Sequence, residues 1–450
     1  MAGYLIKNAR IVNEGKIFTG HVVIRNGLIS EVVRASANQF VPDSSGLEQI
    51  DADGKLLLPG VIDDQVHFRE PGLTHKADIA TESRAAVAGG VTSFMEMPNT
   101  VPNTLTQQIL EEKYQLASKK SAANYSFYMG ASNDNIDEIL KTDHRNVCGV
   151  KVFMGASTGN MLVDDINALN LIFSRSKMLV AVHSEDEPTI QANLELFKEK
   201  YGTNIPVEAH PLIRSEEACY RSSSLAVKLA HIYKTRLHLL HLSTEKEMSL
   251  LDNSKPLRQK KITAEVCVHH LWFEQSDYQR LGTRIKWNPA IKTSRDRDAL
   301  LKALLAGKID VVATDHAPHT PDEKNRDYLH APSGGPLVQH SLPAMLEMVH
   351  QGKISLTQVV DKMCHAPAIC FRVENRGFIR PGFFADLVLV DPARPVTVDS
   401  ENILYKCGWS PFEGVTFSHS VTHTFVNGNP VFENGKINDE FHGQRLTFRT

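Results

Sequence analysis

The feature that most constrains the fold of this sequence is an alternation of short apolar runs with helix-like segments along most of its length. Helix candidates such as 105–119 and 297–306 lie between the runs, with apolar residues at helical spacing. Eight units of this kind favour a closed, parallel (β/α)₈ barrel. We therefore predict an α/β fold whose barrel strands are Leu56–Asp63, Val91–Met95, Tyr125–Met129, Gly149–Met154, Met178–His183, Arg236–His241, Ile262–Cys267 and Asp310–Asp315.

An open, doubly wound sheet is the alternative for such units. That fold binds dinucleotides through a GxGxxG turn after its first strand, and the first run is not followed by one. Eight repeats also suit a barrel better than an open sheet.

The two ends of the chain have a different sequence pattern from the middle. Residues 3–54 and the segment after 385 contain short alternating runs separated by Asn-Gly turns, which is typical of antiparallel β-structure. We predict a small β-sandwich side domain formed by both ends, residues 1–54 and 386–450, beside a barrel domain of residues 55–385.

Composition argues for a small-molecule substrate. The chain carries 49 Lys and Arg against 52 Asp and Glu, so its net charge of -3 offers no strong field to attract nucleic acid or an anionic membrane. A signal peptide and an apolar run of about 18 residues are both missing, so we expect a cytoplasmic protein. The six cysteines are scattered without CxxC pairs, which argues against a disulfide framework or a thiolate zinc site.

Polar residues end several of the predicted barrel strands, where the active sites of barrel enzymes lie. His183, His241 and Asp315 each end an apolar run. Gln65 and His67 follow the first run and are two residues apart, so they project to one face, as two ligands of one ion would. His238 and His241 have odd spacing, which sends them to opposite faces, and we choose His241 because it ends its run. We predict a metal site at these strand ends.

Lys151 lies inside the apolar run Gly149–Met154, where an unpaired ammonium is costly to bury. Two explanations stay open from the residues alone. The lysine reacts as a neutral amine with CO₂ to give a carbamate that bridges two cations, or it forms a salt bridge to Asp63 or Asp315. Asp315 itself combines two abilities: it can bind a metal, and it can move a proton from water to a leaving nitrogen.

Several motifs resemble those of the dihydroorotases of the amidohydrolase superfamily, and the likeness spans nearly the whole chain. The motifs are Pro59-Gly-Val-Ile-Asp-Asp-Gln-Val-His-Phe-Arg-Glu-Pro-Gly, Glu96-Met-Pro-Asn-Thr, Lys151-Val-Phe-Met-Gly, Val182-His-Ser-Glu-Asp, Leu240-His-Leu-Ser-Thr and Ala313-Thr-Asp-His-Ala-Pro-His. The resemblance implies zinc-dependent, reversible hydrolysis of dihydroorotate to N-carbamoyl-aspartate in pyrimidine biosynthesis. It also implies one or two zinc ions, carboxylation of Lys151, and a homodimer.

The same resemblance assigns the substrate contacts. Arg69 and Asn99 are expected to hold the substrate carboxylate, with Asn288 and His319 as further contacts. Hydantoinases and allantoinases share the barrel and the metals, and allantoinase-like sequences usually place Asn where Arg69 stands. A guanidinium suits a ring that carries a carboxylate because its fork binds that group in bidentate fashion.

Gln65 departs from the family pattern. Most dihydroorotases have His-x-His at the first metal motif, and a glutamine oxygen is usually a weaker zinc ligand than an imidazole. We therefore expect Gln65 to be a weak or absent ligand. Ion binding by His67, Asp315 and Lys151 should be looser than ion binding by Lys151, His183 and His241. The departure also leaves open the alternative that the chain is a non-catalytic dihydroorotase homologue with an assembly role.

Overall fold

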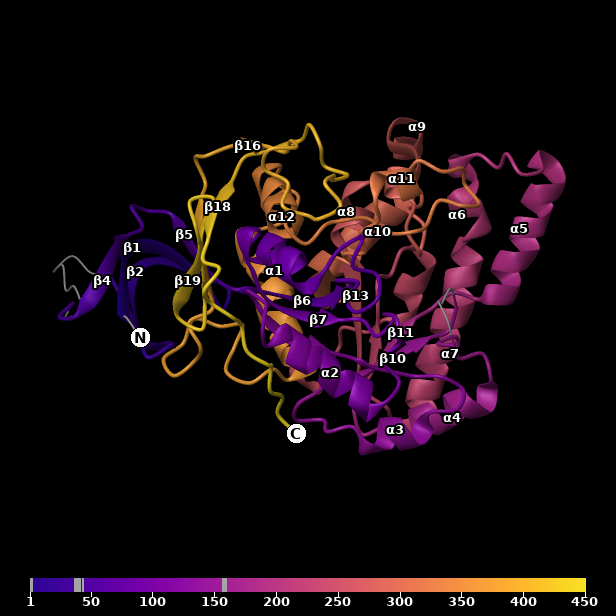
Figure 1. Ribbon diagram of the computed structural model, residues 1–450, viewed down its shortest axis with the longest axis horizontal. Helices are drawn as coiled ribbons and strands as arrows, with labels where there is room; N and C mark the ends of the chain where they lie inside the picture. Colours follow the sequence, from indigo (N-terminus) through magenta and orange to yellow (C-terminus); the bar gives the residue numbers. More distant parts are fainter. Residues whose placement is uncertain (1–2, 36–41, 43, 156–159) are drawn as a thin grey trace.

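The computed structural model describes residues 3–35, 42, 44–155 and 160–450 of the chain. Among these residues the predicted (β/α)₈ barrel is confirmed, with a separate β-sheet formed by the two ends of the chain. Figure 1 shows that sheet at one end of the long axis and helices α5 and α7 at the other. No helix among the described residues is long and apolar enough to cross a membrane.

The barrel consists of two parallel groups of strands that join into a ring. Backbone hydrogen bonds close it: the His67 N–H donates to the His316 carbonyl at 2.7 Å, and the Tyr128 N–H donates to the Glu96 carbonyl at 3.1 Å. In order around the ring the strands are β6 (Val61–Val66), β7 (Val91–Glu96), β8 (Asn124–Phe127) continued by β9 (Met129–Gly130), β10 (Val150–Phe153), β11 (Val180–His183), β12 (Leu237–Leu239), β13 (Ile262–Cys267) and β14 (Val311–Ala313).

The first predicted strand, Leu56–Asp63, was wrong as a single element. It is divided into β5 (Leu56–Pro59), which belongs to the terminal sheet, and β6, which begins the barrel. Gly60 makes the break: its N–H donates to the Asp386 carbonyl at 2.8 Å. A Cβ at this position would lie 2.1 Å from Thr92 Oγ1, so only glycine allows the backbone to pass.

The terminal sheet has nine strands and contains both antiparallel and parallel pairs. Strand β5 pairs in parallel with β1 and antiparallel with β15, so it connects the two ends of the chain. The domain boundaries at 54/55 and 385/386 stay predictions. The strands are β1 (Gly3–Asn13), β2 (Lys16–Arg25), β3 (Leu28–Arg34), β4 (Leu47–Asp51), β5, β15 (Leu387–Asp391), β18 (Ser420–Val426), β19 (Asn429–Glu433) and β20 (Lys436–Ile437), with a separate pair β16 (Val396–Thr397) and β17 (Thr416–Phe417).

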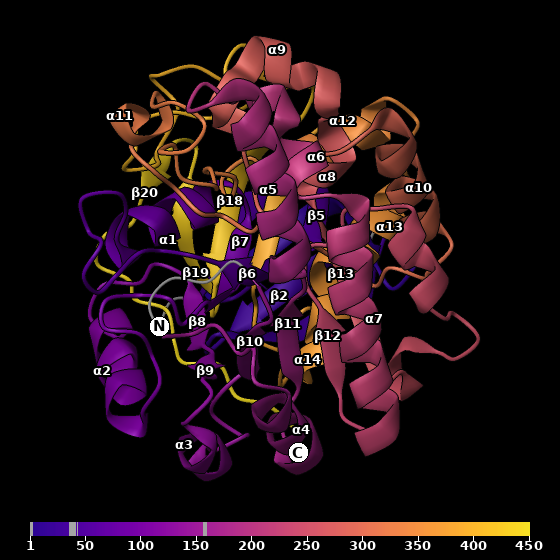
Figure 2. The same cartoon turned by 90° about the vertical axis from the view of Figure 1, so that its right-hand side faces the viewer.

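Helices surround the barrel strands, as Figure 2 shows. The predicted helix 297–306 is α10, and it begins earlier, at Ser294, because Thr293 and Asp296 form a reciprocal capping box. The predicted helix 105–119 is α2. The helices are α1 (Ile79–Ala88), α2 (Gln107–Ala117), α3 (Ile136–Lys141), α4 (Ile166–Arg175), α5 (Glu187–Tyr201), α6 (His210–Ile213), α7 (Glu216–Tyr233), α8 (Val268–Trp272), α9 (Tyr278–Leu281), α10 (Ser294–Leu305), α11 (Pro321–Lys324), α12 (Ser341–His350), α13 (Leu356–Val360) and α14 (Ala366–Phe371).

The core follows from this arrangement. One large apolar cluster lies between the barrel strands and their helices, and a second fills the base of the barrel. The C-terminal segment contributes to the base, because the Leu446 N–H donates to the Tyr125 carbonyl at 2.9 Å and both Leu446 and Phe448 are buried there. The base is therefore closed by packing, and the opposite end of the strands remains available for a site. All six cysteines are free and buried.

Candidate active site

A cavity of about 390 Å³ lies at the C-terminal ends of the barrel strands. Every side chain that the sequence predicts for the site lines this one cavity, although the residues come from five barrel strands or the positions just after them and from three loops. They are Gln65, His67, Arg69, Asn99, Lys151, His183, His241, Asn288, Asp315 and His319.

Three of these residues have a strained backbone. Arg69, His241 and Asp315 have φ values of 67°, 38° and 47°, in the left-handed region that L-residues rarely adopt. Each lies just beyond the end of a barrel strand, β6, β12 or β14. The chain turns sharply there, and side chains that leave neighbouring strands are aimed into the cavity. Such strain concentrates at functional sites.

One group of polar atoms surrounds Asp315. Its Oδ1 lies 3.1 Å from Gln65 Nε2, which donates to it, and 3.1 Å from His67 Nε2. His67 Nδ1 lies 2.8 Å from the oxygen of Asn99. With Nδ1 donating to Asn99, the neutral imidazole presents the lone pair of Nε2 to the carboxylate. We call Gln65, His67 and Asp315 the aspartate half of the cavity.

A second group is built on two histidines. His183 Nδ1 lies 2.9 Å from His241 Nε2, and His183 Nε2 lies 2.9 Å from Glu185 Oε2. Arg214 also donates to Glu185. Burial alone would raise the pKa of Glu185, but Arg214 and His183 hold it at about 2, so the carboxylate stays ionised. We call His183, His241, Glu185 and Arg214 the histidine half.

Lys151 is 1% exposed and lies in the electrostatic range of both halves. Burial lowers its pKa to about 7. After burial itself, the Lys151 charge is among the causes that lower the pKa of His67, His183 and His241. No carboxylate lies within 4.0 Å of its Nζ among the described residues, so the second of the two open explanations, a salt bridge to Asp63 or Asp315, is not formed there. A buried amine of this kind is suited to carbamate formation.

The donor atoms of both halves fit a zinc site. In the aspartate half, the lone pair of His67 Nε2 faces Asp315 Oδ1 at 3.1 Å, so two hydrogen-bond acceptors lie against each other. A protonated imidazolium would turn this contact into a hydrogen bond, but burial lowers the pKa of His67 and disfavours the protonated form. In the histidine half, two ring nitrogens converge, and the buried Nδ1 of His241 has no hydrogen-bond partner among the described residues. Imidazole nitrogens and carboxylate oxygens are typical zinc ligands.

Two of the substrate-binding candidates, Arg69 and His319, lie side by side, with Arg69 Nη2 3.0 Å from His319 Nε2. Arg69 is 8% exposed, and its Nε donates to the Pro318 carbonyl at 3.1 Å. His319 Nδ1 accepts from Lys76 at 3.0 Å, and its Nε2 faces the Ser333 carbonyl at 3.1 Å. Burial, followed by the charge of Arg69, lowers the pKa of His319 well below its ordinary value, so this imidazole is neutral. The other cation here, Lys76, pairs with Glu323 at 2.9 Å, whereas Arg69 forms no ion pair with a described residue.

Sequence reasoning missed Glu185 and Arg214 as members of the site. Glu185 follows His183 by two residues, which was a usable signal because metal-binding histidines commonly donate to a carboxylate. Arg214 lies in the long connection 204–214, which the sequence only suggests to be near the mouth. Its side chain lines the cavity and reaches Glu185 from the segment between α6 and α7.

His238 does not line the cavity with His241, but the prediction that they lie on opposite faces was wrong: both lie within the barrel, because His241 follows the end of β12 with φ 38°. His238 is fully buried inside the barrel, where Nε2 lies 3.2 Å from Asp64 Oδ2 and 3.4 Å from Glu265 Oε2. Burial opposes ionisation, but these two carboxylates raise its pKa to about 9. Glu265 also accepts from the His241 N–H at 3.0 Å, so this charged cluster supports the strained backbone of the histidine half.

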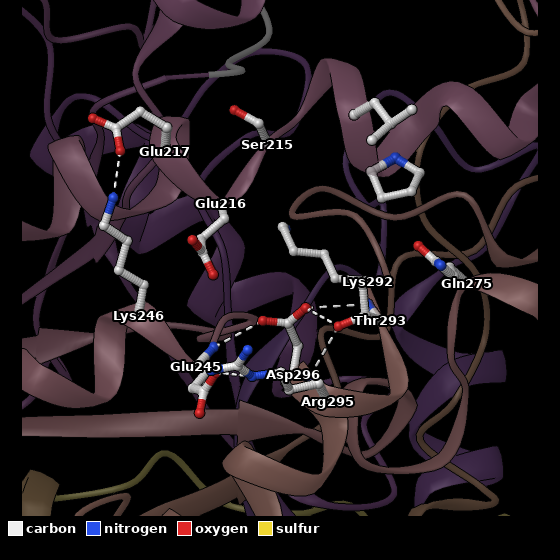
Figure 3. Close-up of a pocket in the computed structure, with 12 residues that line it drawn as sticks. Ser215, Glu216, Glu217, Glu245, Lys246, Gln275, Lys292, Thr293, Arg295 and Asp296 are labelled. Carbon is white, nitrogen blue, oxygen red and sulfur yellow. Dashed lines mark hydrogen bonds and ion pairs between the residues drawn. The ribbon is translucent and has the colours of Figure 1, made fainter.

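A larger hollow, of about 660 Å³, lies beside the N-termini of α7 and α10 (Figure 3). Its charged side chains are largely satisfied by one another: Lys246 pairs with Glu217, and Arg295 pairs with Glu245. None of the predicted site residues lines it. Size alone therefore does not identify the active site, and the convergent polar atoms of the smaller cavity do.

An α/β barrel whose strand ends gather histidines, a lysine and an aspartate into one cavity is the architecture of a metal-dependent hydrolase. The chain belongs to the Amidohydrolase family, whose model matches residues 56–431. It is 35% identical to a dihydroorotase of Methanosarcina acetivorans over 448 residues, covering 96% of this chain and 92% of that protein.

Other relatives share the fold with different stated activities. The chain is 30% identical to an allantoinase of Solibacter usitatus, covering 99% of this chain and 97% of that protein. Its structure matches that of an L-hydantoinase (dihydropyrimidinase) of Arthrobacter aurescens with a TM-score of 0.91 and 27% identity, covering 99% of this chain and 100% of that one. The protein is therefore a cyclic amidohydrolase that acts on a small molecule.

Proposed function

We propose that this chain is a dihydroorotase, which reversibly hydrolyses dihydroorotate to N-carbamoyl-aspartate as a step of pyrimidine biosynthesis. The observation that carries the proposal is Arg69, a buried guanidinium on the cavity wall beside the aspartate half. Dihydroorotate carries a carboxylate on its ring, whereas hydantoin and allantoin do not. A buried cation is costly unless a ligand anion balances it, so this wall favours the acidic substrate.

The residues that would hold zinc are His67 and Asp315 in one half and His183 and His241 in the other, with carboxylated Lys151 shared between them. Zinc bound there supplies Lewis-acid polarisation of the amide carbonyl and a lowered pKa for the attacking water. Gln65 supports the first half mainly as a donor to Asp315, because its amide nitrogen faces that carboxylate.

The protein side chains then position the substrate and transfer the proton. Arg69 and Asn99 bind the ring carboxylate, and His319 and Asn288 line the remaining wall. Asp315 accepts the proton of the attacking water and delivers it to the ring nitrogen as the C–N bond breaks. Water oxygen becomes part of the new carboxylate, and the ring nitrogen becomes the amine end of the carbamoyl group. The reverse reaction uses the same Asp315 proton.

The sharpest test is Arg69→Met, measured on dihydroorotate and on hydantoin. Removing one partner of a buried ion pair costs about 2–5 kcal/mol, so kcat/KM on dihydroorotate should fall about 30- to 5,000-fold. Turnover of the uncharged ring should change much less. Equal losses on both substrates would contradict carboxylate recognition by Arg69 and favour a hydantoinase-like or allantoinase-like enzyme.

Gln65 favours a second candidate, a non-catalytic dihydroorotase homologue with an assembly role. Against it, the cavity retains every other expected side chain, including the buried Lys151 and the strained Asp315. The absence of turnover in a zinc-loaded sample would favour this candidate. We also propose a homodimer in the cytoplasm, and light scattering on the purified chain tests the dimer.

A further inference from the structure

The base of the barrel carries an unusual concentration of cations. Two adjoining hollows, one of about 250 Å³ and a smaller one, share Arg258, Ile369 and Arg372 in their walls. Neither is lined by an Asp or Glu side chain. The cationic side chains around them are Arg236, Arg258, Lys260, Lys261, Arg372, Arg376, Arg380 and Arg449.

Three of these cations are neutralised nearby. Lys260 pairs with Asp310, Arg376 with Asp386 and Arg380 with Glu14. The other five have no carboxylate partner among the described residues.

Arg236, Arg258 and Arg372 form the centre of this group, which we call the base arginines. Arg236 is half-buried, and its guanidinium donates to the Cys370 carbonyl at 2.7 Å and to no other described residue. Arg258 and Arg372 make no side-chain hydrogen bond or ion pair among the described residues. Burial, followed by the charge of Arg372, lowers the pKa of Arg236 to about 10. Like charges held this close favour an anion between them.

The backbone places the base arginines at one end of the barrel, where Arg236 is half-buried and Arg258 and Arg372 are exposed. Arg236 immediately precedes β12, and Arg258 lies in the 3₁₀ turn Leu257–Gln259 that leads toward β13. Arg372 ends α14 in the left-handed conformation, with φ 60°, and its carbonyl accepts from the Arg449 N–H at 2.8 Å. They therefore lie at the N-terminal ends of the strands, opposite the catalytic cavity.

We propose that the base arginines form a binding site for a small phosphate-bearing molecule, separate from the catalytic cavity. Guanidinium groups match phosphate oxygens in bidentate pairs, and three of them from separate segments can surround one phosphate group. The larger hollow adds an apolar wall of Ile369, Val373 and Phe378, which suits the organic part of such a ligand. This proposal is independent of the proposed dihydroorotase activity.

The test is calorimetric titration of the zinc-loaded chain with pyrophosphate and with ATP at low ionic strength. We expect saturable binding to one site per chain at the base. Arg258→Gln with Arg372→Gln should weaken it about tenfold or more, because two charge-assisted hydrogen-bonding groups are lost. The corresponding double Lys variant should retain part of the affinity, because it keeps the charge.

Lys119→Gln with Lys228→Gln is the matched control, since it removes two exposed cations, one in the turn that follows α2 and one in α7. It should bind like the wild type. Any phosphate binding at the catalytic zinc is common to all variants and cancels in the comparison. Equal affinity of the wild type and the double Gln variant, no saturable binding by the wild type, or equal affinity for sulfate would overturn the proposal. Binding of ATP but not pyrophosphate would also overturn it, because the affinity would then come from the apolar wall and not from the base arginines.

Discussion

The two halves of the catalytic cavity are supported in different ways. In the histidine half, His183 is oriented by the ionised Glu185, which Arg214 holds in turn. In the aspartate half, a neutral amide, Gln65, donates to Asp315 in the position where an imidazole would be a ligand. In the histidine half, the charged pair of Glu185 and Arg214 therefore orients a ligand for an ion, whereas in the aspartate half Gln65 mainly holds the Asp315 carboxylate in place.

This difference predicts a division of labour. The histidine half should provide most of the zinc affinity, and the aspartate half should provide most of the proton transfer. Lys151 lies in the range of both and should couple them when carboxylated.

The largest expected effect is on turnover through Asp315. Asp315→Asn keeps the shape but removes the proton acceptor, so kcat should fall about 10²- to 10⁴-fold. Zinc bound by the histidine half should remain, which metal determination on the same sample checks. Asp322→Asn, at an exposed carboxylate in α11, is the control and should keep normal turnover. Loss of all zinc together with activity would contradict the division of labour.

The next effect concerns support of His183. Glu185→Gln removes the carboxylate that orients the imidazole, and loss of such a partner lowers metal affinity about 10- to 100-fold. Competition with a zinc chelator measures this. Glu199→Gln, on the exposed side of α5, provides the baseline. If both variants bind zinc equally well, Glu185 does not support the ion.

Stability should depend on pH through Lys151. Burial lowers the pKa of the unmodified lysine from 10.5 to about 7. Between those values the unfolded chain binds the extra proton, so the stability of metal-free, CO₂-free protein should rise as pH increases from about 7 toward 10. Lys151→Met should flatten this part of the Tm–pH curve, whereas Lys228→Met should leave it unchanged. A slope that persists in Lys151→Met would place the titration elsewhere.

The smallest expected effect is an increase in metal affinity. Gln65→His supplies an imidazole to the aspartate half and should raise its metal affinity a few-fold, since imidazole is the stronger zinc ligand. Unchanged metal content during chelator titration of the variant would show that the donor role of Gln65 toward Asp315 matters more than its ligand type.

Much of the barrel and the cavity could be predicted from the sequence, for a physical reason. The carboxyl ends of parallel strands meet at one end of a barrel, so polar residues at the ends of apolar runs must gather there. That reasoning brought together His67, His183, His241 and Asp315 without any long-range information.

Other features depend on contacts that no local pattern records. The division at Gly60 arises because its backbone passes against Thr92. Arg214 reaches Glu185 across 29 positions of the sequence, from a loop with no regular periodicity. The base arginines come from three separate segments, and their unpaired state depends on where every carboxylate lies. Periodicity indicates which face a residue occupies but not which distant charge it meets.

The central claim is most directly tested by turnover of the purified chain on dihydroorotate, hydantoin and allantoin, with zinc content determined on the same sample. The account predicts selective hydrolysis of dihydroorotate with about one to two zinc ions per chain. Preference for hydantoin or allantoin, or no turnover of any of the three after zinc and bicarbonate are supplied, would contradict it.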